Sequence, residues 1–248
     1  DIKNEIQDFK NLGYTLLEIS SAYRWQGDYK MASKYNLESI AIAEQYDMQK
    51  LLANNFYHQS LMLINKGNYK EARAIIEKAI IISKKIDSMS NVAKYLDCLG
   101  IILRHERRFE ESVNVVNEAL AISEDLGDKH GLRKYLNSIG LTKERYGDFK
   151  GALKLYIKCL DLSKTINEKR SIAVSYNNIA GMYLLIGNYD ESLRNQKKAF
   201  SYAKRINYKE GEAGFAFNIA THLLRQKKYT QSLKYINISI QAFQDMEN

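Results

Sequence analysis

The sequence contains no proline and only 13 glycines in 248 residues. Proline removes a hydrogen bond from a helix and glycine weakens a helix, so this scarcity is typical of long, uninterrupted helices. Long apolar runs are also missing, because no stretch approaches the roughly 20 residues that a membrane-spanning helix needs. We therefore expect no direct membrane insertion. No stretch has the basic, apolar and small-residue order of a signal peptide.

Cysteine is scarce as well. Cys98 and Cys159 are the two cysteines of the chain, and they occupy different places in the pattern described below. A disulfide between them is possible in principle, but two buried thiols are the better interpretation, since a free cysteine behaves as a small apolar residue. The cellular compartment stays open between cytoplasm and periplasm.

Motifs for catalysis and metal binding are missing too. The four histidines have no partner at helical spacing that would complete a metal site. No glycine-rich phosphate loop, nucleophile elbow or paired-cysteine motif occurs. We therefore predict no enzymatic activity, no metal and no cofactor.

What the sequence does contain is a four-residue turn that returns every forty residues and ends in tyrosine or phenylalanine. Its six copies are 26–29, 66–69, 106–109, 146–149, 186–189 and 226–229. Apolar residues at three- and four-residue steps on both sides of each turn indicate two amphipathic helices per repeat. A fixed period of this length predicts a stack of repeats rather than a single globular core.

The predicted fold is therefore all-α, a right-handed α-solenoid of six helix-turn-helix repeats. The expected domain is one solenoid over residues 9–248, with residues 1–8 as the tail of a preceding repeat helix. The expected repeats are about 9–48, 49–88, 89–128, 129–168, 169–208 and 209–248. Polar or small residues separate consecutive repeats, and Gly127 is expected to take a left-handed conformation there. Because the chain starts at Asp1, inside a repeat, we expect it to be a piece of a longer protein or a mature form.

Aligning the six repeats reveals columns of small residues, which allow two helices to approach closely. The first column holds Ser20, Ser60, Gly100, Gly140, Ala180 and Ala220. The second holds Ala32, Ala72, Ser112, Ala152, Ser192 and Ser232. With the turn aromatic, these columns resemble those of the tetratricopeptide repeat (TPR) over essentially the whole chain. The departures are a forty-residue period in place of the usual thirty-four and the absence of a proline at the end of the second helix.

This resemblance implies a scaffold that binds a protein or an extended peptide. The longer period is similar to that of kinesin light chains, of bacterial peptide-sensing regulators, and of arrays that precede bacterial histidine kinases or helix-turn-helix domains. In the family, the first helices of successive repeats line a concave groove. The implied role is protein–protein interaction or signal transduction, as the sensory or scaffolding part of a larger bacterial regulatory protein. Alternatives are a cytosolic peptide-pheromone sensor and a structural module that spaces domains or self-associates as a homodimer.

Polar residues on the first helices give the candidate ligand-binding site. Asparagine is a mediocre helix former, and its carboxamide both donates and accepts hydrogen bonds, which suits the backbone of an extended peptide. Bridging of adjacent helices is the alternative role. Lys94 and Lys134 flank the asparagines as a cationic rim that would favour acidic segments. The predicted set is Asn137, Asn177, Asn178, Asn218, Lys94, Lys134, Asp97, Tyr57, Phe217 and Arg145.

The formal net charge of +8 also fits a nucleic-acid ligand, which would bind through a basic stripe. The lysines instead fall on helix positions predicted to face solvent, dispersed along the chain. Examples are Lys84, Lys85, Lys154, Lys164, Lys197, Lys198 and Lys204. We therefore expect a solvated outer face and no nucleic-acid binding.

Overall fold

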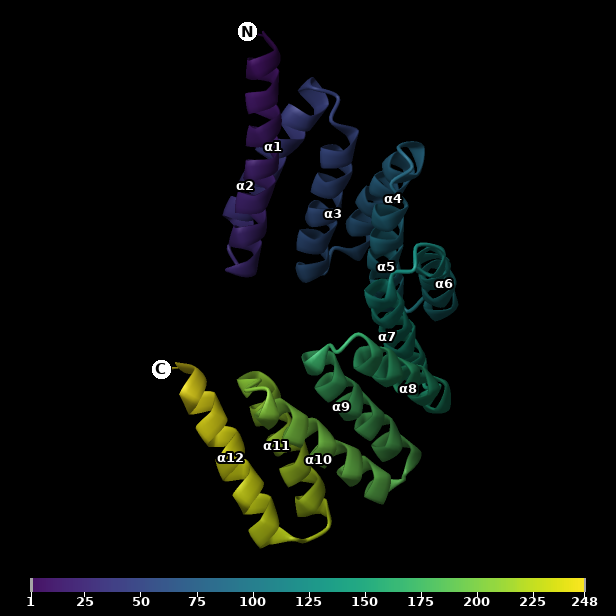
Figure 1. The fold of residues 1–248 in the computed structure, drawn as a ribbon, viewed down its shortest axis with the longest axis vertical. Helices are drawn as coiled ribbons and strands as arrows, with labels where there is room; N and C mark the ends of the chain where they lie inside the picture. Colours follow the sequence, from purple (N-terminus) through teal and green to yellow (C-terminus); the bar gives the residue numbers. More distant parts are fainter. Residues whose placement is uncertain (1, 248) are drawn as a thin grey trace. The chain divides into compact units, whose positions relative to one another are not determined.

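The computed structural model describes residues 2–247, and side chains from residue 8 to residue 246. Within these residues the secondary structure is twelve α-helices with no strand, which confirms the predicted all-α fold. The helices are α1 (Ile2–Trp25), α2 (Tyr29–Gln45), α3 (Gln49–Asn65), α4 (Tyr69–Lys85), α5 (Met89–His105), α6 (Phe109–Asp125), α7 (Lys129–Tyr146), α8 (Phe149–Thr165), α9 (Lys169–Ile186), α10 (Tyr189–Arg205), α11 (Lys209–Arg225) and α12 (Tyr229–Glu247). Figure 1 shows them as successive helix pairs joined by short turns.

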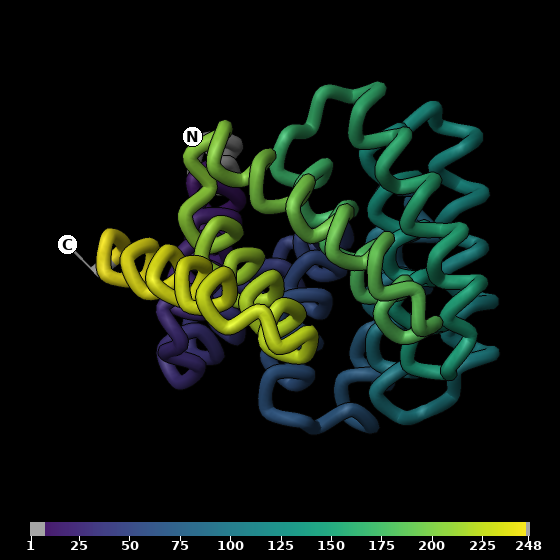
Figure 2. Tube along the Cα trace, turned by 90° about the horizontal axis from the view of Figure 1, so that it is seen from below, coloured from purple at the N-terminus to yellow at the C-terminus, as the bar shows by residue number. Residues whose placement is uncertain are grey.

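Every helix break depends on one residue with a positive φ angle. Within each pair this residue is Gly27, Gly67, Arg107, Gly147, Gly187 or Lys227. Between pairs it is Asp47, Asp87, Gly127, Asn167 or Asn207. Glycine, and to a lesser degree asparagine and aspartate, tolerate this left-handed conformation. The tube in Figure 2 doubles back at these turns. The left-handed conformation expected of Gly127 is confirmed, with φ of 64°.

The boundary expected near residue 8 is not a helix end, because α1 continues without interruption from Ile2 to Trp25. The sequence offers a reason. Gln7 occupies the repeat position that holds a short turn-forming residue at the other breaks, such as Asp47 or Asn167. Glutamine lacks the short side chain that stabilises such turns. The assignment of residues 1–8 to a preceding repeat, and of the rest to one solenoid, stays a prediction.

Small residues of the predicted columns bond across the helix pairs α1–α2, α3–α4, α5–α6 and α11–α12. The hydroxyl of Ser20 donates to the carbonyl of Ala32 over 2.7 Å, so a small residue of α1 bonds directly to the backbone of α2. In α5 and α6 the roles are exchanged, since the Ser112 hydroxyl donates to the Gly100 carbonyl over 2.8 Å. Both hydroxyls are buried. Such bonds need backbones close enough that no larger side chain fits between them.

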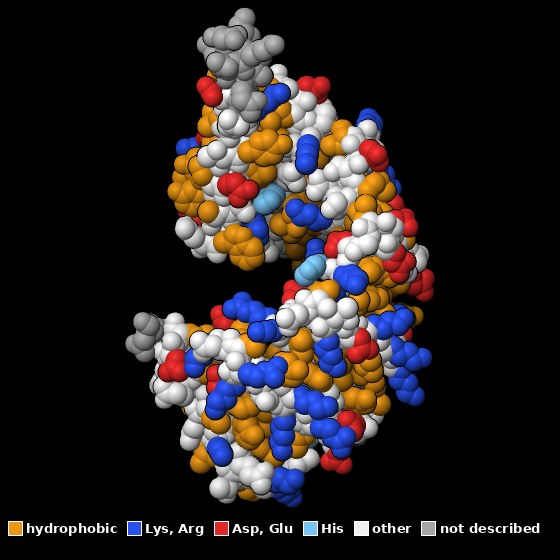
Figure 3. All heavy atoms as spheres, in the orientation of Figure 1, with side chains coloured by type: hydrophobic (Ala, Val, Ile, Leu, Met, Phe, Trp, Pro, Cys, Tyr) orange, Lys and Arg blue, Asp and Glu red, His pale blue; other side chains and the backbone are white. Residues whose placement is uncertain are grey.

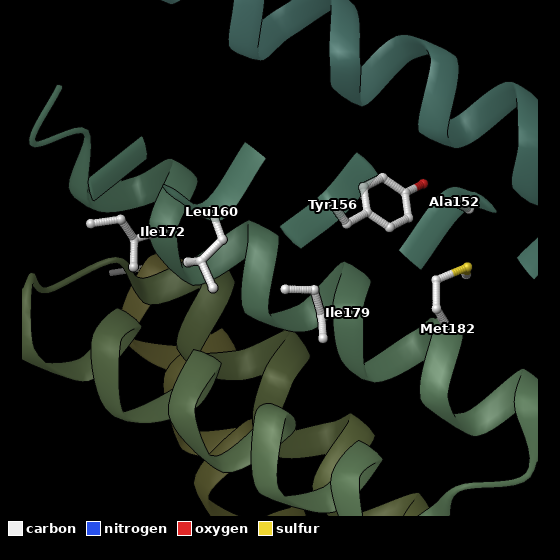
Figure 4. Close-up of a cluster of buried hydrophobic side chains, with 6 residues drawn as sticks. All are labelled: Ala152, Tyr156, Leu160, Ile172, Ile179 and Met182. Carbon is white, nitrogen blue, oxygen red and sulfur yellow. The ribbon is translucent and has the colours of Figure 1, made fainter. Parts of the chain in front are cut away.

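The chain forms two compact units, Asp1–Gly127 and Asp128–Asn248, each with three helix pairs. In the first unit, the first helices α1, α3 and α5 contact one another in that order, and in the second α9 contacts α11. A core cluster of the second unit joins α8 and α9 (Figure 4). Its buried members are Ala152, Tyr156, Leu160, Ile172, Ile179 and Met182. The apolar core thus lies between the helices. The polar residues of the first helices are not part of this cluster, and they are the residues of the candidate binding site.

The two cysteines are buried thiols that form no disulfide, as predicted. Burial raises the pKa of the Cys159 thiol to about 12, and the nearby Arg133 lowers it less. A thiol with so high a pKa holds its proton at neutral pH. Among the described residues, no helix has the length and apolarity that crossing a bilayer requires.

Candidate functional site

Four asparagines connect the first helices of the second unit, and we call them the asparagine row: Asn137, Asn177, Asn178 and Asn218. The Asn178 Nδ2 donates to the Asn137 Oδ1 over 3.2 Å, which joins α7 to α9. The Asn218 Nδ2 donates to the Asn177 Oδ1 over 3.0 Å, which joins α9 to α11. All four side chains are partly buried. The structure therefore brings together the four asparagines that the sequence singled out.

These bonds give the asparagine row a structural role without using up its hydrogen-bonding capacity. Each carboxamide carries two N–H donors and a carbonyl with two lone pairs. Each interhelix bond uses one donor of one residue and one lone pair of its partner. The bonds also fix the orientation of the carboxamides, which lowers the entropy lost when a ligand binds. The arrangement suits the alternating donors and acceptors of an extended backbone.

Gly181 lies one turn beyond Asn177 and Asn178 on α9. A Cβ built on Gly181 would meet nothing within 4 Å, so packing inside the protein does not require glycine there. Glycine in a helix interior is less favourable than alanine by about 1 kcal/mol. Open space beside the asparagine row would let a ligand backbone come close.

Three more predicted site residues belong to the second unit. Lys134 and Arg145 are exposed on or near the ends of α7, and the Lys134 ammonium lies 5.5 Å from the Tyr135 ring centroid. Phe217, next to Asn218, is 59% exposed, which is unusual for a phenylalanine. These exposed cationic and aromatic residues lie on the helices α7 and α11, which also carry Asn137 and Asn218.

The remaining predicted residues, Tyr57, Lys94 and Asp97, lie in the first unit. The Lys94 ammonium lies 4.1 Å from the Tyr57 ring centroid, and Tyr57 stacks on Tyr95 at 5.2 Å. Asp97 differs from expectation, since its side chain is only 3% exposed and does not line an open groove wall. The reason is that α5 packs on α3, α4 and α6, so that three neighbouring helices cover its side chains.

His58 is the residue of this region that sequence reasoning undervalued. Burial lowers its pKa from 6.5 to about 4, and the positive charges of Lys94 and Arg24 lower it further in smaller measure. Its buried Nδ1 has no hydrogen-bond partner. The pKa of Tyr95 is raised, chiefly by burial and then by Tyr57. No spacing rule reveals such a residue, because its neighbours come from three different helices.

The lysines predicted to face solvent do so. All seven named above are exposed. On the face shown in Figure 3, Lys and Arg side chains of the second unit are scattered among apolar and neutral groups rather than gathered into a stripe. A nucleic-acid site would show a continuous basic footprint. Over the part of the chain that the structure describes, no group of three metal-ligating side chains converges.

Paired antiparallel helices with small-residue contacts and polar first-helix positions define the class of helical repeat scaffolds. Family models of the tetratricopeptide repeat match residues 53–85, 91–165 and 172–207. The chain belongs to the tetratricopeptide repeat family. This fold is in general a binding scaffold. No curated protein sequence matches the chain.

Several solved structures share the fold. A signal-transduction ATPase with a tetratricopeptide repeat sensor from Pyrococcus horikoshii is 17% identical, with a TM-score of 0.81 over 98% of this chain and 37% of that one. Aspartyl phosphate phosphatase F from Bacillus subtilis is 14% identical, with a TM-score of 0.74 over 98% and 73%. A Rap protein complexed with Competence and Sporulation Factor is 15% identical, with a TM-score of 0.67 over 99% and 78%. At these identities the likeness concerns the fold alone.

Proposed function

We propose that the chain is the sensory or interaction region of a larger bacterial regulatory protein, and that the first-helix face of its second unit binds an extended polypeptide. The observation that carries the proposal is the asparagine row, whose oriented carboxamides connect α7, α9 and α11. The open space at Gly181 supports close approach of a ligand backbone. The fold likeness to a Rap protein complexed with a signalling factor, and to a sensor of a signal-transduction ATPase, supports the regulatory role.

Recognition would work mainly through the ligand backbone. A carboxamide that accepts from a peptide N–H and donates to a peptide carbonyl recognises any residue in an extended conformation. Lys134 adds a positive charge at one side of the row, which favours ligands with acidic residues and speeds their association.

Selection of random displayed peptides on the immobilised chain tests the proposal. A selected peptide should lose about tenfold in affinity with Asn178→Ala, since one backbone hydrogen bond contributes about 0.5–1.5 kcal/mol. Gly181→Leu should weaken binding further while the protein stays folded, because its side chain enters open space. Asn237→Ala changes an exposed asparagine of α12 and should leave affinity unchanged. Fluorescence anisotropy measures the affinities. Equal affinities for all four proteins would refute the site, and failure to enrich any peptide would refute the function.

Self-association through α12 is a second candidate, favoured by one observation. Tyr229, Leu233, Ile240 and Phe243 are exposed at helical spacing on α12 and form an apolar stripe. Exposed apolar stripes of this kind mark interaction surfaces. Light scattering at rising concentration should then show a dimer, and Leu233→Lys should return it to the monomer. If the molecular mass in solution stays that of a monomer at all concentrations, self-association through α12 is excluded.

A further inference from the structure

The side-chain carbonyl oxygen of Gln196 on α10 is buried without a hydrogen-bond partner. The side chain is only 5% exposed, and its Oε1 accepts no hydrogen bond. A polar atom buried without a partner costs about 1–3 kcal/mol, so buried polar groups are nearly always paired. In the first four repeats the same repeat position is buried as Asn36, Ile76, Val116 and Tyr156. Asn36, another amide at this repeat position, donates to the Asn55 carboxamide over 2.9 Å. The Oε1 of Gln196, in contrast, has no hydrogen-bond partner.

The preceding repeat shows what Gln196 lacks. There the Tyr156 hydroxyl donates to the Glu144 Oε2 over 2.8 Å. The Tyr156 ring fills the space beside Gly140, where a Cβ would lie 2.7 Å from the ring, and the ring lies in the core of Figure 4. In the next repeat, Leu184 takes the position of Glu144, so the acidic partner is gone. Gln196 is also smaller than tyrosine, so space remains unfilled.

A cavity of about 70 Å³ lies at this place, where α9, α10 and α11 meet. Its lining residues are Leu184, Gln196, Asn218, Thr221, His222 and Arg225. A larger pocket of about 270 Å³ shares His222 and Arg225 and is otherwise lined by Tyr189 and Gln226. We call the cavity of 70 Å³ the glutamine pocket, and the larger pocket adjoins it at the two shared residues. Because Asn218 lines the cavity and also donates to Asn177, the glutamine pocket adjoins the asparagine row.

The cavity of 70 Å³ offers a ligand one unsatisfied acceptor and a set of cationic donors. Gln196 presents a buried Oε1 that accepts no hydrogen bond. Arg225, which is exposed at the cavity, presents the N–H donors of its guanidinium. A primary carboxamide suits both groups, since its N–H donates to the Gln196 carbonyl and its oxygen accepts from the guanidinium. A carboxylate would offer acceptors alone and leave the Gln196 carbonyl unsatisfied.

Size and charge agree with this assignment. The cavity of 70 Å³ is about half of the ~150 Å³ that holds a benzene molecule, so it admits a short side chain and excludes an aromatic ring. His222 contributes no fixed positive charge, because burial, Arg225 and Lys228 lower its pKa while Asp190 raises it less. The pocket therefore holds one fixed cation beside neutral amides.

We propose that the glutamine pocket binds a primary carboxamide, as the side chain of an asparagine or glutamine of the polypeptide held along the asparagine row. The part concerning the polypeptide rests on the proposed function. Binding of the carboxamide itself does not, so a small amide tests it alone.

The test is an NMR titration of the ¹⁵N-labelled chain with propionamide and, separately, with propionate. The side-chain NH₂ signals of Gln196 are assigned by their loss in Gln196→Met, a substitution of similar volume at a position that is apolar in other repeats. As the propionamide concentration rises, the chemical shifts of the Gln196 NH₂ and Arg225 Nε–H signals should both change and reach a plateau. Both changes should fit the same dissociation constant. Gln196→Met should weaken the response at Arg225 by about tenfold, the effect of losing one hydrogen bond. Gln231→Met, at an exposed glutamine of α12, should leave the response unchanged.

Each contrary outcome is distinct. No saturable shift with propionamide would mean that the cavity holds water only, and would overturn the proposal. Tighter binding of propionate than of propionamide would overturn it as well. If propionamide binds but displayed peptides select no asparagine or glutamine, the role in polypeptide recognition is wrong. If propionamide binds and no peptide is selected at all, the proposed function fails while the carboxamide site stands.

Discussion

Acidification should destabilise the first unit through His58. Its pKa is about 4 in the fold, against 6.5 for an ordinary histidine, because burial and the charges of Lys94 and Arg24 oppose protonation. The unfolded chain therefore takes up a proton before the folded chain does. The stabilising effect of the neutral ring is fully present above pH 6.5 and is lost as the pH falls toward 4.

The expected loss follows from the two pKa values. At about 1.36 kcal/mol per pKa unit, the complete loss is about 3 kcal/mol, and at pH 5 about 2 kcal/mol has gone. Urea unfolding at pH 7.5 and pH 5.0 measures the change in the free energy of unfolding. His58→Asn removes the titrating ring, so its loss between the two pH values should be smaller than that of the wild type by about 2 kcal/mol.

A matched substitution makes the result specific. His130 is exposed on α7, so His130→Asn should keep the pH dependence of the wild type. The NMR titration of the His58 Cε1–H should have its midpoint near 4. A midpoint near 6.5, or an equal acid-induced loss in His58→Asn and the wild type, would refute the role of burial.

Four further substitutions test the backbone and the packing, each by urea unfolding. Arg107→Gly should raise the free energy of unfolding by up to about 1 kcal/mol, because Arg107 holds a φ of 62°. Gly67→Ala, at a φ of 80°, should lower it by about 1–2 kcal/mol. A loss of stability in Arg107→Gly, or a gain in Gly67→Ala, would contradict the strain argument. Gly140→Ala should lower it by about 1–3 kcal/mol, because the new Cβ would meet the Tyr156 ring at 2.7 Å. Gly181→Ala should raise it by about 1 kcal/mol, because the position is open, and a loss there would show an unseen contact.

The forty-residue periodicity of the sequence predicted most of the fold. Six turns at one spacing predicted the helix pairs, and the small-residue columns predicted which faces meet, because both features depend on local geometry that repeats. The sequence also located the asparagine row, since mid-helix asparagines at two adjacent repeat positions bond to one another across neighbouring first helices. The alignment also suggested a helix end near residue 8, whereas α1 runs from Ile2 to Trp25. Gln7 stands where Asp, Asn or Gly stands at the other breaks between pairs.

The environments of Asp97 and His58 could not be predicted in the same way. The repeat register places Asp97 on the same helix face as Asn137 and Asn177, but the burial of a side chain depends on every helix that packs around it. Burial is the main cause of the lowered pKa of His58, and the smaller contributions come from Lys94 on α5 and Arg24 on α1, which are 36 and 34 residues away along the chain. Repeat spacing shows which residues are equivalent, and equivalent residues can differ in everything that their neighbours decide.

The same limit explains why the glutamine pocket is visible only when sequence and structure are read together. The repeat alignment shows Gln196 in a column of core residues, which by itself suggests an ordinary polar substitution. The structure adds that its Oε1 is buried without a partner, whereas the Tyr156 hydroxyl has one in Glu144. The asparagine row is only partly buried, so a ligand that bonds to its remaining donors and acceptors replaces water with modest gain. At Gln196 a ligand would satisfy a buried carbonyl oxygen that the fold leaves unsatisfied, so a bond formed there contributes more to affinity and to selectivity than a bond to the row.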